Sequence, residues 1–247
     1  MIKQLIKKLL PTFVISLINR CINFFYFIIN WNPWANYSYS QEGEDILLNK
    51  IFNKKKKGFY IDIGAHHPKR FSNSYLFYKK DWQGINIDCM PGSMKIFKKF
   101  RPRDINLEIG IAENEGTNDY HVFNETALNS FSKKHSQELN QGDNPYFIKE
   151  IIKVKVMPLS KILDIYLKKK EIDFLDVDVE GMDLSVLRSN DWSRYRPKFV
   201  LVEILENNFN QVEESLINKF MKSQNYNIFA KLDNTVFFKD QFCDFKY

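Results

Sequence analysis

The sequence has few of the residues that build disulfide-rich or zinc-binding domains. Its three cysteines, Cys21, Cys89 and Cys243, are odd in number and widely spaced over 247 residues. They provide neither a disulfide framework nor a metal-binding cluster, so we expect a protein of the reducing cytoplasm. The sequence also lacks internal repeats, low-complexity tracts and the aromatic signatures of RNA-binding domains, and we expect no nucleic acid partner.

Glycine is scarce too, and the G-x-G-x-x-G fingerprint of dinucleotide-binding folds is absent from the nine glycines present. One segment nevertheless has the pattern of a nucleoside site. An apolar run ends at Asp62, Gly64 follows, and a second apolar run ends at Asp88. Glycine lets the backbone approach a ligand closely, and a carboxylate ending the next strand can accept both ribose hydroxyls. The segment therefore predicts a nucleoside-type ligand on an α/β sheet.

The net charge of +6 is spread thinly in short lysine clusters. Such clusters are typical of a solvated surface between elements. The alternative is attraction to anionic partners, such as the phosphates of a nucleotide sugar or a membrane surface.

The first thirty residues have their own pattern. Between Ile2 and Phe25, apolar residues recur with the spacing of an amphipathic helix, interrupted at Pro11. Polar residues near the middle, including Arg20, argue against a membrane-spanning helix, and no signal-peptide cleavage site follows. We expect residues 1–36 to form an extension and 37–247 the main domain. The extension either lies on the inner surface of a membrane or docks on the domain or on a second subunit, giving a homodimer.

From residue 40 onward, predicted helices and strands alternate, which favours a mainly parallel, doubly wound α/β sheet. A turn at Asp233-Asn234 predicts a final antiparallel hairpin. The expected helices are a first one that begins at Gln41 after a Ser40 cap, then 72–80, 93–100, 159–167, 183–187 and 212–223. The expected strands are 59–61, 84–88, 106–110, 119–123, 151–156, 174–177, 199–203, 225–230 and 235–239.

Several motifs together resemble the FkbM family of O-methyltransferases, which are class I S-adenosylmethionine (SAM)-dependent enzymes. They are SQEGED at 40–45, GFYIDIGAHHP at 58–68, GINID at 84–88, DFLDVDVEGMDLSVL at 173–187 and PKFVLVEI at 197–204. The resemblance covers about residues 40 to 239. Two residues depart from it: Pro68 stands where many members have glycine, and Asp176 where a small residue or lysine is common.

The resemblance implies a Rossmann-like, seven-stranded fold, with SAM as the cofactor. Asp62 and Gly64 then line the methionine end of the cofactor, and Asp88 binds the ribose. Gln41 belongs to the leading motif near the mouth of the cofactor site, and His66 lies in the cofactor loop.

A sugar hydroxyl is a weak acid, so methyl transfer to it needs a base or a cation in contact with it. Of the four histidines, His67 is the preferred base. Asp178 and Glu203 end neighbouring strands and predict a Mg²⁺ or Mn²⁺ site. Glu180 is a further catalytic candidate, and its alternative role is to stabilise the N-terminus of the following helix.

Residues 124–148 form a long polar insertion, which predicts a lid or substrate loop, with a mobile surface loop as the alternative. Asn129, Ser130 and Ser132 provide neutral groups suited to a sugar. We expect the acceptor to be a sugar, nucleotide-activated or part of a glycan, in the synthesis of a bacterial surface or capsule polysaccharide. The rival functions are an NAD-dependent sugar oxidoreductase and a non-catalytic cofactor-binding scaffold.

Overall fold

The computed structural model describes residues 11–28, 32, 34–141, 143–168, 170–206 and 208–244. The chain divides into two units, Met1–Tyr37 and Ser38–Tyr247.

The larger unit is built on a seven-stranded sheet with the order β3-β2-β1-β7-β8-β10-β9. The first five strands in that order are parallel, and β10 is antiparallel to both of its neighbours. This arrangement confirms the predicted α/β fold with a C-terminal antiparallel hairpin. The strands are β1 (Phe59–Ile63), β2 (Gln83–Asp88), β3 (Ile105–Glu108), β7 (Phe174–Val177), β8 (Phe199–Glu203), β9 (Tyr226–Leu232) and β10 (Thr235–Asp240).

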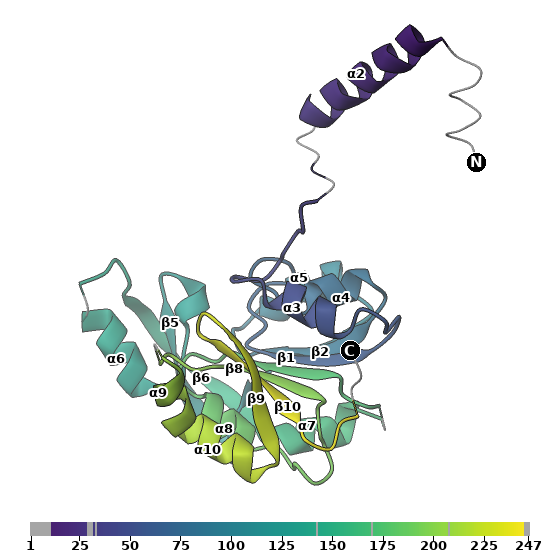
Figure 1. The fold of residues 1–247 in the computed structure, drawn as a ribbon. Helices are drawn as coiled ribbons and strands as arrows, with labels where there is room; N and C mark the ends of the chain where they lie inside the picture. The colour runs from purple at the N-terminus through teal and green to yellow at the C-terminus, as the bar shows by residue number, and fades with distance from the viewer. Residues whose placement is uncertain are drawn as a thin grey trace. The chain divides into compact units, whose positions relative to one another are not determined.

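Helices cover both faces of this sheet, as the continuous apolar runs of its central strands require. On one face, Leu48 and Ile51 of α3 pack against Tyr60 and Phe174, whose rings stack 5.5 Å apart. Figure 1 shows α3 and α4 on that side of the sheet and α7, α8 and α10 on the other. The helices are α3 (Glu44–Ile51), α4 (Tyr75–Lys79), α5 (Ser93–Phe100), α7 (Leu159–Tyr166), α8 (Asp183–Arg188), α9 (Phe209–Glu214) and α10 (Leu216–Ser223).

A second, three-stranded sheet has the order β4-β6-β5. It comprises β4 (Gly110–Ile111), β5 (Gly116–Phe123) and β6 (Ile148–Met157), with a 3-10 turn η1 (Thr126–Leu128) and helix α6 (Lys133–Gln141) between β5 and β6. The single strand expected at 106–110 is therefore wrong. The chain leaves the main sheet after β3, because Gly110 and Ile111 pair with β6 instead.

Three predicted helices have clearly different boundaries. The helix expected at 72–80 is the shorter α4, Tyr75–Lys79. The first helix begins at Glu44 and not at Gln41, because Gly43 adopts a left-handed conformation (φ 90°) at its N-terminus. Ser40 still contributes, since its hydroxyl accepts a hydrogen bond from the Asp45 amide at 3.2 Å. The helix expected at 212–223 is two helices, because Ser215 is extended (ψ 151°) and its hydroxyl caps α10.

The smaller unit contains helix α2 (Thr12–Ile28), which follows Pro11. Several of its apolar side chains are exposed, among them Phe13 (72%), Leu17 (60%) and Phe24 (64%). The part of the predicted amphipathic helix before residue 11 lies outside the described residues. In the described part of the chain, no helix combines the length and the apolar character that crossing a bilayer requires.

Candidate functional site

A cavity lies where the carboxyl ends of β1, β2 and β7 meet. It is lined by Gly64 and His66 after β1, by Asp88 and Cys89 at the end of β2, and by Asp178 after β7. The chain leaves β1 toward β2 on one side, and β7 pairs on its other side. Ligands of open α/β sheets bind at such a switch point of the strand order.

The shape of this cavity depends on a glycine, Gly64, in the loop after β1. Its φ is +85°, and a Cβ built on it would lie 1.7 Å from the main-chain oxygen of Asp178. Its amide donates to the Ile87 carbonyl at 2.9 Å. Only glycine therefore lets the loops after β1 and β7 approach so closely.

Asp88 is held in place by main-chain donors. The His66 amide donates to Oδ2 at 3.0 Å, and the Met90 amide donates to Oδ1 at 2.8 Å. Each carboxylate oxygen can accept more than one hydrogen bond, so Asp88 retains acceptor capacity toward the cavity that it lines. This geometry suits a pair of vicinal hydroxyls.

Another wall of the cavity comes from the second sheet and the insertion. Tyr120, Asn129 and Phe131 line it, and a Cβ on Gly110 would meet the Phe131 ring at 2.7 Å. Burial raises the pKa of the Cys89 thiol to about 12. This cysteine is thus a protonated wall residue and not a nucleophile at neutral pH.

A second cavity, which we call the acidic pocket, adjoins the first. Its lining comes from the segment that leads into α3, the loop between β1 and α4, the ends of β7 and β8, and the β9–β10 turn. The lining residues are Gln41, Glu42, Glu44, Phe71, Asn73, Asp176, Val177, Asp178, Glu180, Glu203, Asp233, Asn234 and Thr235. Asp178 and Glu180 line both cavities. The two cavities therefore adjoin each other at these two residues.

The carboxyl groups at this junction have raised pKa values. Burial, followed by repulsion from neighbouring carboxylates, raises the pKa of Asp178 to about 6 and that of Glu180 to about 9. The same causes raise the pKa of Glu203 to about 8, and burial with the charge of Asp178 raises that of Asp183 to about 7. Carboxyl groups that titrate near neutral pH are suited to exchanging protons with a substrate.

These shifts predict a pH-dependent effect of Glu180→Gln on stability. The folded protein holds the Glu180 proton up to a pKa of about 9, whereas its ordinary value is 4.5. The folded state therefore binds more protons than the unfolded state in this window, and the contribution of Glu180 to stability falls as pH rises. Glutamine does not titrate, so the melting temperature of the variant should rise relative to wild type between pH 5 and pH 9. The exposed Glu214→Gln is the control; an equal response of both variants would contradict the prediction.

The other predicted site residues do not all line the first cavity. His67 lines neither cavity; its Nδ1 accepts hydrogen bonds from the Lys69 and Arg70 amides at 3.1 and 3.0 Å. Gln41 lines only the acidic pocket. Asp62 is buried and accepts a hydrogen bond from Ser74, outside both linings. The roles of His67 as a base and of Asp62 as a cofactor ligand stay predictions.

Of the predicted acceptor-binding residues, only Asn129 lines the first cavity. The Ser130 hydroxyl donates to the Glu180 carbonyl at 2.6 Å, and the Ser132 hydroxyl accepts from the His135 amide at 3.3 Å. The insertion is thus bonded to the loop after β7. Sequence reasoning missed Tyr120 and Phe131, because their position depends on the pairing of β5 with β6.

For a metal ion the geometry gives no support. Within the described ranges, no group of three or more His, Cys, Asp or Glu side chains is arranged to hold one. Asp178 and Glu203 do share the acidic pocket, as predicted from their neighbouring strands.

The fold and the cavity at its switch point define a Rossmann-like methyltransferase. Residues 62–228 match the methyltransferase FkbM domain. A comparison with curated proteins gives no significant match. Because the domain match covers more than half of the sequence, the chain belongs to the FkbM family of methyltransferases, and the resemblance inferred from the sequence is confirmed.

Proposed function

We propose that the protein is a SAM-dependent O-methyltransferase that acts on a sugar hydroxyl. Its acceptor is a nucleotide-activated sugar or a glycan in the synthesis of a bacterial surface polysaccharide. The observation that carries the proposal is the contact between the two cavities at Asp178 and Glu180. A donor in the first cavity and an acceptor in the acidic pocket would meet there.

The residues of the first cavity fit SAM. Gly64 lets the loops after β1 and β7 come close together at the wall of the cavity, and the fixed Asp88 carboxylate suits the ribose hydroxyls. The apolar wall of Ile109 and Phe131 suits a flat adenine ring. When bound, SAM supplies a methyl group on a cationic sulfur, which an acceptor oxygen can attack.

The protein then has to orient the acceptor and remove its proton. Asp178 lines both cavities, and its raised pKa of about 6 leaves it ionised at neutral pH and able to accept a proton. We assign it the role of base. Glu180 and Glu203, with pKa values of about 9 and 8, are protonated at the same pH and can donate hydrogen bonds to acceptor oxygens. A Mg²⁺ or Mn²⁺ ion on Asp178 and Glu203 is the alternative route.

Binding and transfer assays distinguish the rival functions. Calorimetry with S-adenosylhomocysteine and with NAD distinguishes a methyltransferase from an oxidoreductase. A screen of nucleotide-activated sugars with a labelled methyl donor distinguishes an enzyme from a silent scaffold. Transfer to no acceptor, with tight S-adenosylhomocysteine binding, would leave the sugar proposal without support.

Asp88→Ala tests the ribose assignment. The variant should bind S-adenosylhomocysteine more weakly by about 1.5–3 kcal/mol, the range for hydrogen bonds to a charged group. Glu108→Ala is a matched control, because Glu108 ends the neighbouring strand β3 and does not line the cavity. Equal affinities of the wild type and Asp88→Ala in calorimetry would refute the assignment.

For the N-terminal unit we propose contact with the inner surface of a membrane. The exposed apolar side chains of α2 and the nearby cations in the sequence, Lys3, Lys7, Lys8 and Arg20, suit an anionic lipid surface. Removing residues 1–31 should abolish cosedimentation with anionic vesicles and leave S-adenosylhomocysteine binding intact. High salt should weaken the binding of the full chain. A truncated protein of lower oligomeric mass with unchanged vesicle binding would favour a homodimer instead.

A further inference from the structure

A fully buried arginine lies beneath the loop that joins β1 to α4. Arg101 is 0% exposed and follows helix α5. Arginine is rarely buried without partners, because removing its charge from water is costly. Its contacts therefore show what it holds in place.

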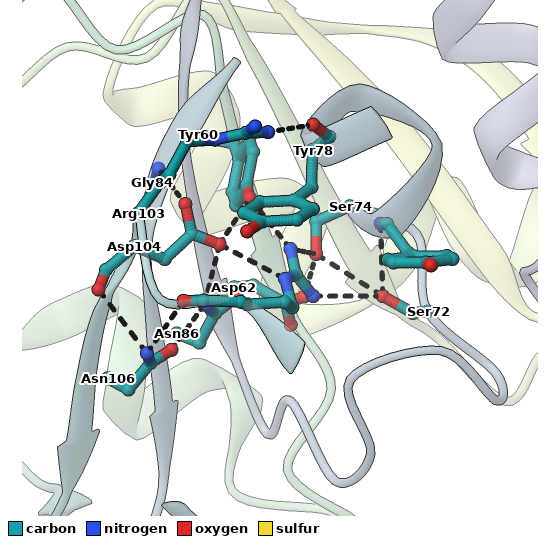
Figure 2. A network of polar contacts seen from close by, with 12 residues as sticks. Tyr60, Asp62, Ser72, Ser74, Tyr78, Gly84, Asn86, Arg103, Asp104 and Asn106 are labelled. Atoms are coloured by element: carbon teal, nitrogen blue, oxygen red, sulfur yellow. Dashed lines mark hydrogen bonds and ion pairs between the residues drawn. The ribbon is translucent and has the colours of Figure 1, made fainter. Parts of the chain in front are cut away.

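The guanidinium binds both serines at the end of that loop. Its Nη2 donates to the Ser74 hydroxyl at 2.8 Å, and its Nη1 lies 3.4 Å from the Ser72 hydroxyl. Ser74 in turn donates a short hydrogen bond to Asp62, at the start of the loop. In Figure 2, Ser72 and Ser74 lie to the right of Asp62. Arg101 thus connects the two ends of one loop through Ser74.

The other side of the guanidinium is anchored to the sheet. Nε donates to Asp104 at 3.0 Å, and Nη2 donates to the Tyr60 hydroxyl at 2.7 Å. Asp104 also accepts from the Gly84 amide at 2.9 Å and from Asn86 at 3.0 Å, both in β2. Asp104 and Asn86 lie to the left of Asp62 in Figure 2. The position of Arg101 is therefore fixed by groups that do not belong to the loop.

The loop between these ends, residues 64–71, carries walls of both cavities. Gly64 and His66 line the first cavity, and Phe71 lines the acidic pocket, as does the adjacent Asn73. A shift of the loop would change both cavities at once. Arg101 itself lines neither of them.

We infer that Arg101 is a positioning residue that acts through Ser74 to hold loop 64–71 in the shape that binds the donor. The inference rests on the proposed SAM site. If Arg101 only stabilised the fold, the loss of any one of its hydrogen bonds would have the same effect on donor binding and on the loop. The geometry predicts different effects of removing the two hydroxyls. Ser74 connects the guanidinium to the loop, whereas Tyr60 connects it only to the sheet.

The test compares Ser74→Ala with Tyr60→Phe, since each removes one hydroxyl from the same guanidinium. Ser74→Ala should weaken S-adenosylhomocysteine binding about tenfold, as expected for lost hydrogen bonds to charged groups. It should also speed amide hydrogen exchange in residues 64–71. Tyr60→Phe should lower the melting temperature without either effect. Arg101→Lys, which keeps the charge but not the planar fork, should resemble Ser74→Ala.

Two results would overturn the inference. One is a Ser74→Ala variant with wild-type affinity and wild-type loop exchange. The other is a Tyr60→Phe variant that changes both measurements as much as Ser74→Ala does. If the wild type fails to bind S-adenosylhomocysteine, the proposed function fails instead, and the exchange measurement still tests the positioning of the loop.

Discussion

Gly64→Ala should reduce the affinity for S-adenosylhomocysteine by a factor of about 100 or more. The added Cβ would lie 1.7 Å from the Asp178 carbonyl oxygen, so the loops after β1 and β7 must move apart. A misplacement of about 1 Å in an active site can lower the reaction rate about a hundredfold. We expect a loss of similar size in affinity, because the displaced loops form walls of the cavity. Calorimetry measures the affinity, and circular dichroism shows whether the variant is folded.

Gly92→Ala is a closely matched control for this change. Gly92 has the same φ of +85°, but a Cβ there would meet nothing within 4 Å. Its substitution should therefore show only the cost of a left-handed alanine, about 1–2 kcal/mol of unfolding free energy, with unchanged binding. If both variants bind alike, close approach at Gly64 is not what shapes the cavity.

Asp178→Asn should lower the rate of methyl transfer by roughly 10²–10⁴, the range for loss of a general base. Affinity for S-adenosylhomocysteine should stay within a few fold, because asparagine has nearly the same shape. His67→Ala is the informative comparison, since His67 was predicted as the base and lines neither cavity. We expect its effect on turnover to be much smaller. The opposite order of the two variants would return the role of base to His67.

The same assay decides between a base and a metal ion at Asp178. Activity that is lost with a chelator and restored by Mg²⁺ or Mn²⁺ would assign Asp178 and Glu203 as ligands. Activity indifferent to a chelator, together with a large loss in Asp178→Asn, would support proton transfer. A fully active Asp178→Asn would exclude both roles for this residue.

The sequence was sufficient for the main sheet because its central strands are short apolar runs separated by helical patterns, and β2 and β8 end in carboxylates. Asp88 and Gly64 could be placed at one edge for the same reason, since parallel strands bring their carboxyl ends together. Asp62 looked equivalent to Asp88, yet it is buried against Ser74. Which face of the sheet a carboxylate takes depends on its position within the strand, and a helix partner on that face is not visible in a local motif.

Contacts between distant segments account for what the sequence did not indicate. The pairing of β4 and β5 with β6 joins residues 25 to 46 positions apart along the chain, and no turn signal specifies it. Arg101 gave no signal either, because an arginine after an amphipathic helix is normally at the surface. The break at Ser215 depends on one extended residue within an otherwise continuous helical pattern.

The acidic pocket is assembled from parts of the chain that are far apart in the sequence. Its inner wall, Asp176 to Glu180, lies within residues 62–228, the stretch that matches the shared family domain. Its outer wall comes from Gln41–Glu44 and from Asp233–Thr235, which flank that stretch on either side and meet where Thr235 donates to Glu44 at 3.1 Å. If the acidic pocket holds the acceptor, as we propose, substitutions in these two short segments should change which acceptor binds and leave the donor cavity unchanged, because neither segment lines that cavity. Replacing both segments together should therefore be the most direct way to give this fold a new acceptor specificity.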